Sequence, residues 1–183
     1  MPDRSPNMFD DPRYRQGWVL EPPIEGIWRP LLTPGHPFNR AEDESGPGAR
    51  RGMPYAWSGM TPDQLAAIFD YAPWERAQGY NDRPVHAWFL ELAEAFPEVT
   101  FHGFVHTTFQ PRIVVEGGEV VAPAERVLEL VKWIWDRHAW KDWSRPNDVH
   151  QHKIDGTVLN GEEGANAHAP QDEGKWHHWF WWD

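Results

Sequence analysis

Aliphatic and phenylalanine side chains are concentrated in the middle of this 183-residue chain. Leu, Ile, Val and Phe number 23 in residues 61–148, but only 8 in residues 1–60 and 5 in residues 149–183. Because the burial of apolar surface drives folding, a hydrophobic core is expected in the middle segment. The sequence therefore predicts a core domain over residues 61–148 between an N-terminal arm and a C-terminal arm.

The two arms lack the periodicity of regular secondary structure. Residues 1–60 hold ten of the eighteen prolines and seven of the fifteen glycines. Proline fixes φ and removes a backbone donor, so this segment is predicted to be extended and irregular. The C-terminal arm over residues 149–183 is also predicted to be irregular, and it ends in a run rich in tryptophan and histidine.

Start and stop signals predict three helices in the middle segment. Thr61 is placed as an N-cap, with a proline in the first turn and Gln64 at the capping-box position, so a helix is predicted over residues 61–72. Apolar residues at three- and four-residue steps predict two further helices, over residues 84–96 and 123–138.

One strand is predicted over residues 99–109, because apolar and polar residues alternate there. Phe101 and Val105 fall on one face, and His102 and His106 fall on the other. Four residues along a straight strand separate the two histidines by roughly 13 Å, which is too far for both to bind one metal ion. We expect these histidines to line the face of the sheet that points away from the core.

A β-hairpin is predicted over residues 113–121. Gly117 and Gly118 stand between two short β-branched runs, and glycines can take the positive φ values of a tight hairpin turn. Together with the other elements, the hairpin predicts an α+β fold. Its core is a small three-stranded antiparallel sheet packed with about three helices and flanked by the two irregular arms.

Charge and cysteine content exclude several classes of protein. The formal net charge is −11, and no segment forms the basic stripe that phosphate-backbone binding requires, so no nucleic-acid partner is expected. No membrane partner is expected, because no apolar run is long enough to span a bilayer. The absence of cysteine excludes disulfides and thiolate chemistry. Acidic residues and prolines stand where a signal peptide would be basic and apolar, so we expect a cytoplasmic location or a particle assembled there.

Thirteen tryptophans are the unusual feature of the composition. Tryptophan is enriched at the energetic centres of protein interfaces, and a large exposed cluster would promote aggregation. The arms are therefore predicted to use tryptophans as anchors, either on the core of this chain or on neighbouring protein subunits. The predicted interface anchors are Trp18, Trp28, Trp176, Trp179, Trp181 and Trp182.

A pair of histidines in the C-terminal arm offers the one recognisable metal-binding spacing. His150 and His152 would share a face of an extended segment, as in several metal-dependent enzymes, and His168 could complete a site. The carboxylate that a cupin-type site needs four or five residues after the second histidine is missing, because Gly156 and Thr157 stand there. No metal or other cofactor is therefore predicted, and these three histidines are kept as candidates.

Together these features predict a non-enzymatic structural protein. Its arms would dock on neighbouring subunits of a large homo- or hetero-assembly, and a minor or decorating protein of a virion has this architecture. One alternative is a metal-dependent enzyme that uses His150 and His152. A second is a carbohydrate-binding module, because exposed tryptophan rings can stack on sugars.

Overall fold

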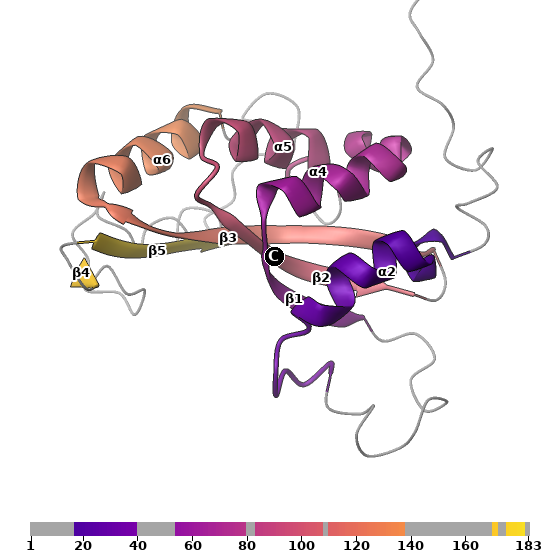
Figure 1. Cartoon of the computed structure of the whole chain (residues 1–183). Helices are drawn as coiled ribbons and strands as arrows, with labels where there is room; N and C mark the ends of the chain where they lie inside the picture. Colours follow the sequence, from indigo (N-terminus) through magenta and orange to yellow (C-terminus); the bar gives the residue numbers. More distant parts are fainter. Residues whose placement is uncertain are drawn as a thin grey trace, which may run out of the picture.

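The computed structural model describes residues 17–39, 54–79, 83–107, 110–137, 170–171 and 175–181. These residues form an α+β fold in which helices pack on an antiparallel sheet (Figure 1), as the sequence predicts. The α-helices are α2 (Pro22–Trp28), α4 (Pro62–Tyr71), α5 (His86–Ala95) and α6 (Ala124–Arg137). Short 3₁₀ helices are η2 (Trp18–Leu20), η3 (Arg29–Leu31) and η4 (Pro73–Ala77).

The sheet is larger than the three strands predicted. Its order is β1-β2-β3-β5-β4, and every neighbouring pair is antiparallel. Four strands are long and the fifth, β4, has two residues. The strands are β1 (Tyr55–Met60), β2 (Thr100–His106), β3 (Arg112–Pro123), β4 (Pro170–Gln171) and β5 (Lys175–Trp181).

The three predicted helices are confirmed as α4, α5 and α6, with small changes at their ends. At α4 the capping box is present: the Gln64 amide donates to the Thr61 hydroxyl at 3.3 Å, and the Thr61 amide donates to the Gln64 side chain at 3.0 Å. Helix α6 begins after Pro123, which ends β3, and His138 lies outside the described residues.

The predicted Gly-Gly hairpin is wrong, because β3 runs without a turn through Gly117 and Gly118. A Cβ atom on Gly118 would lie 2.8 Å from the Thr100 carbonyl oxygen and 3.0 Å from the Phe180 ring. Glycine is needed here because β3 packs closely against its neighbours. The chain does not reverse at this point.

Both predicted arms contribute strands to the sheet, although the sequence predicts them to be irregular. From the N-terminal side, β1 pairs with β2; from the C-terminal side, β5 pairs with β3 over seven residues. In β1, Gly59 has a φ of 79° at a register shift, which lets Met60 return to the buried face. The domain boundaries at residues 60 and 148 stay a prediction.

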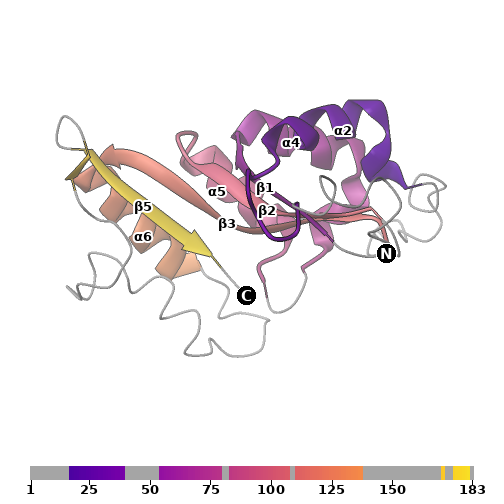
Figure 2. The same cartoon turned by 90° about the horizontal axis from the view of Figure 1, so that it is seen from below.

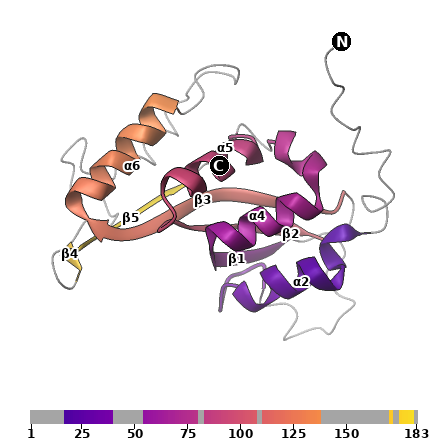
Figure 3. The same cartoon turned by 45° about the horizontal axis from the view of Figure 1, so that its top comes forward.

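Helices α4, α5 and α6 lie together on one face of the sheet (Figure 3); in Figure 2, which is seen from below, β5 passes in front of α6. The core lies between these helices and the strands. In β2, Phe101, Gly103 and Val105 are buried on the core side. His102 and His106 point to the opposite face and are half-buried. This confirms the predicted alternation. None of the helices in the described part of the chain is long and apolar enough to cross a membrane.

Candidate functional site

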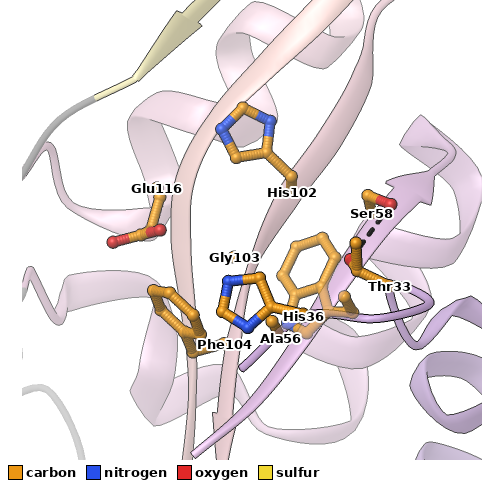
Figure 4. Close-up of a pocket in the computed structure, with 9 residues that line it drawn as sticks. Thr33, His36, Ala56, Ser58, His102, Gly103, Phe104 and Glu116 are labelled. Atoms are coloured by element: carbon orange, nitrogen blue, oxygen red, sulfur yellow. Dashed lines mark hydrogen bonds between the residues drawn. The ribbon is translucent and has the colours of Figure 1, made fainter. Parts of the chain in front are cut away.

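A cavity of about 260 Å³ opens on the face of the sheet that carries no helices (Figure 4). Its lining comes from β1, from β2, from β3 and from the loop after η3. The lining residues are Thr33, His36, Ala56, Trp57, Ser58, His102, Gly103, Phe104 and Glu116. In Figure 4, His102 lies at one end, His36 and Phe104 at the other, and Thr33 and Ser58 along the β1 side. We name this feature the open-face cavity.

Strand register places the polar residues of β1 and β2 at the cavity. Ser58 pairs with His102, and Ala56 pairs with Phe104, so these four side chains share the face that points away from the helices. The small Ala56 side chain leaves room between the larger rings of its neighbours. The cavity thus follows from the side-chain pattern of two adjacent strands.

A β-bulge in β3 brings a carboxylate to the same place. His102 pairs with Gly117 and Gly103 pairs with Val115, which leaves Glu116 as the extra residue. The Glu116 carboxylate accepts a hydrogen bond from the Arg83 guanidinium, and both side chains are largely buried, at 18% and 9% exposed. The one acidic side chain that lines the cavity is therefore neutralised by an adjacent cation.

The loop over residues 32–39 forms one wall and is held along the edge of β1. The Asn39 side chain accepts from the Ala56 amide at 3.0 Å and donates to the Ala56 carbonyl at 2.8 Å. The Thr33 amide also donates to that carbonyl at 3.0 Å. These bonds satisfy the backbone N–H and C=O groups of Ala56 on the edge strand β1, which could otherwise pair with another strand. They also hold the loop with Thr33 and His36 beside the strands.

His36 is held in a neutral form with a known tautomer. The Phe38 amide donates to His36 Nδ1 at 3.2 Å, so Nδ1 is an acceptor and the proton lies on Nε2. Burial lowers the pKa of His36 below its usual range. Its ring lies 5.0 Å from Phe38 and 6.0 Å from Phe104, and the two phenylalanine rings are 5.4 Å apart. This aromatic group closes one end of the cavity.

His102 is also neutral near pH 7. Burial lowers its pKa to about 4, and the Glu119 carboxylate opposes that shift only in part. Within the described residues His102 makes no hydrogen bond, so one ring nitrogen can donate and the other can accept. His106, on the same strand, does not line the cavity; burial and two nearby arginines lower its pKa to about 4.

Two hydroxyl groups line the β1 side of the cavity. The Thr33 hydroxyl donates to the Ser58 hydroxyl at 3.2 Å, which leaves the Ser58 hydrogen available. Trp57 pairs with Gly103, and a Cβ atom on Gly103 would lie 2.9 Å from the Trp57 ring, so this ring packs in the core on the other face of the sheet. Its indole N–H, which has no acceptor among the described residues, is therefore not a donor of the cavity.

The six predicted tryptophan anchors do not form one surface. Trp18 and Trp28 are fully buried, and their indole N–H groups donate at 2.8 Å to the carbonyls of Pro111 and Val19. Both pack into the core of this chain, which is one of the two alternatives that the sequence leaves open. Trp176 packs partly buried against the same core.

The other three anchors are the last tryptophans of the sequence, and two of them, Trp179 and Trp181, lie on β5. Trp179 is half-buried on β5, while the Trp181 side chain and the whole of Trp182 lie outside the described residues. Their role as anchors stays a prediction.

The candidate metal ligands His150, His152 and His168 also lie outside the described residues. Within the described ranges, no group of three or more histidine, aspartate or glutamate side chains could hold a metal ion. The open-face cavity therefore offers hydrogen-bonding and aromatic contacts, and its described side chains do not form a metal centre.

Comparisons with protein-family models, with curated proteins and with solved structures find no match to this chain. A function must therefore be argued from the chemistry of the site, because a fold class alone does not specify one. Of the cavity residues, sequence analysis singled out His102 by its place in an alternating strand. It missed His36, Ser58 and Glu116, for which no local motif was present.

Proposed function

We propose that this protein is a non-enzymatic binding protein that takes a small molecule into the open-face cavity. The observation that carries the proposal is a concave site with polar groups that can bond a ligand, namely the His102 ring, which makes no hydrogen bond within the described residues, and the Ser58 hydroxyl. Binding sites are typically concave and mostly apolar, with a few polar groups that fix orientation. The aromatic end and the hydroxyl side of the cavity match that pattern.

The described residues support binding better than catalysis. Nucleophilic catalysis needs a nucleophile within hydrogen-bonding reach of a base. Ser58 contacts the Thr33 hydroxyl, His36 Nδ1 is occupied by a backbone amide, and Glu116 is bonded to Arg83. Among the described side chains of the cavity, no hydroxyl is bonded to a histidine or a carboxylate.

The proposal is tested by titrating the ¹⁵N-labelled full chain with a mixed set of small ring compounds, sugars, acids and amines. We expect at least one compound to shift the amide signals of Ser58, His102 and Phe104 in a saturable way. The variant Ser58→Leu narrows the cavity and should abolish these shifts. The control Val121→Ala changes a side chain that is 51% exposed, and should leave them unchanged. No saturable shift at these residues would overturn the proposal.

The assembly with neighbouring subunits that the sequence predicts stays a prediction. Analytical ultracentrifugation of the full chain tests it: a concentration-dependent oligomer would support assembly, and a monomer at every concentration would exclude self-assembly.

A further inference from the structure

The proposed binding function can be taken one step further, to the class of ligand. We infer that the open-face cavity binds an uncharged planar ring that carries hydrogen-bond acceptors and is no larger than a single nucleobase or a pyridine carboxamide. This inference rests on the proposed function. It is drawn from the size of the cavity, its aromatic wall, the charges around it and its available donors.

The volume limits the ligand to a small molecule. Drug-sized ligands occupy pockets of roughly 300–1,000 Å³. The open-face cavity, at about 260 Å³, lies below that range. A single six-membered ring with one substituent fits within this volume, whereas a disaccharide or a nucleotide would extend out of the open side of the cavity.

The shape favours a flat molecule. The cavity lies against the surface of two paired strands, where Ala56 presents only a methyl group. The rings of His36 and Phe104 stand at one end, with centroids 6.0 Å apart (Figure 4). Aromatic rings prefer offset or edge contacts with other rings at such distances. A planar ligand can lie on the strands and meet these rings.

The charges favour an uncharged ligand. Glu116 is the one formally charged residue in the lining, and the Arg83 guanidinium already neutralises it. The two histidines of the lining are neutral near pH 7, because burial lowers the pKa of both. A charged ligand would lose its hydration without gaining an unpaired counter-charge, which is unfavourable at a buried site.

The hydrogen-bonding groups favour a ligand with acceptors. The Ser58 hydroxyl and the protonated Nε2 of His36 are donors at the cavity. His102 supplies one donor and one acceptor. A ring with a carbonyl group or a ring nitrogen would satisfy several of these groups together.

Four matched probes test the ligand class in the ¹⁵N-labelled full chain at pH 7. Nicotinamide is neutral and planar, nicotinate is its anionic counterpart, 3-(aminomethyl)pyridine is cationic, and cyclohexanecarboxamide is neutral but not planar. We expect nicotinamide to shift the signals of Ser58, His102 and Phe104, and to bind at least tenfold more tightly than the other three probes. Ser58→Ala should weaken its binding about twofold to tenfold through the loss of one hydrogen bond, and Val121→Ala should not change it.

The outcomes separate this inference from the proposed function. Equal or tighter binding of a charged probe, or of the saturated ring, would overturn the ligand class and leave the binding function standing. No shift with all four probes would also overturn the ligand class alone, provided that the broader compound set does shift the site. No shift with either set would overturn both.

Discussion

The two faces of the central sheet are built from the same strands but carry different side chains. In β2, Phe101 is fully buried under the helices, whereas its neighbour His102 is half-buried at the open-face cavity. The covered face is filled by apolar side chains from the four α-helices, from η2 and η4, and from four strands. The helix-free face keeps neutral histidines, hydroxyls and a bulged glutamate around an unfilled space. This difference indicates that one face holds the fold together and the other is available for recognition.

The largest expected effect separates the two faces within one strand. Phe101→Ala removes a side chain that is fully buried, and should lower the free energy of unfolding by about 3–5 kcal/mol. His102→Ala removes a half-buried ring that makes no hydrogen bond within the described residues, and should cost about 1 kcal/mol or less. Urea denaturation at pH 7 measures both. Equal losses for the two variants would contradict the division between a stabilising face and a recognition face.

The pH dependence of stability compares a histidine of the helical layer with one of the cavity. His86 is 1% exposed, stacks on Phe69 and bonds to the Glu75 carbonyl at 2.8 Å. Burial lowers the pKa of His86 to about 4. In the unfolded chain the pKa of His86 is about 6.5, so below that pH the unfolded state binds a proton more readily than the folded state. The free energy of unfolding is therefore highest above pH 6.5 and falls as the pH falls toward 4. At most about 3 kcal/mol is lost through this group.

Urea midpoints at pH 7.5 and pH 5 for the wild type and for His86→Phe measure this loss. The variant keeps a ring against Phe69 and should show a smaller loss of stability between the two pH values. His102→Phe should also reduce the loss, because burial lowers the pKa of His102 to about 4 as well. An unchanged pH dependence in His86→Phe would contradict this account.

Gly118 is a position at which the strands are tightly packed. Gly118→Ala places a Cβ atom 2.9 Å from Val99 Cγ1 and 2.8 Å from the Thr100 carbonyl oxygen. The strands must move apart, so we expect a loss of about 1–3 kcal/mol. Gly26→Ala is the matched control, because that exposed glycine of α2 has nothing within 4 Å and alanine favours the helix. The control should gain roughly 0.5–1 kcal/mol in urea denaturation.

The sequence predicted what local chemistry determines. The N-cap of α4 is specified by Thr61 and Gln64, three residues apart, and the alternation of β2 is specified by successive side chains. Gly118 was misassigned to a turn because its contacts come from Thr100 and Phe180, which are distant in the sequence. A glycine between β-branched residues is compatible with both roles, and only the tertiary structure distinguishes them.

The strands of the flanks were missed because their polarity does not alternate. In β5, the buried face takes His178 and Phe180, while the other face takes His177 and Trp179, so both faces mix histidines and aromatic residues. Hydrophobic periodicity is the main local signal for a strand, and it is absent here.

The cavity could be predicted only in part for the same reason. His102 follows from the alternation of β2. His36, however, is placed by Asn39, whose side chain binds the edge of β1, and Glu116 is placed by a bulge that depends on pairing between β2 and β3. No local pattern encodes either contact.

The smallest expected effect lies on the helix-free face, away from the cavity. Glu119 accepts from His177 Nε2 at 2.9 Å across β3 and β5, and the two side chains are 42% and 27% exposed. Contacts of this kind contribute roughly 0.2–1 kcal/mol at most, because solvent screens the charges. Glu119→Gln keeps an acceptor and should change the urea midpoint only slightly, with no further change in 0.5 M salt. A loss of unfolding free energy comparable to that of Phe101→Ala would show that the helix-free face also stabilises the fold. The two faces would then differ in chemistry but not in their contribution to stability.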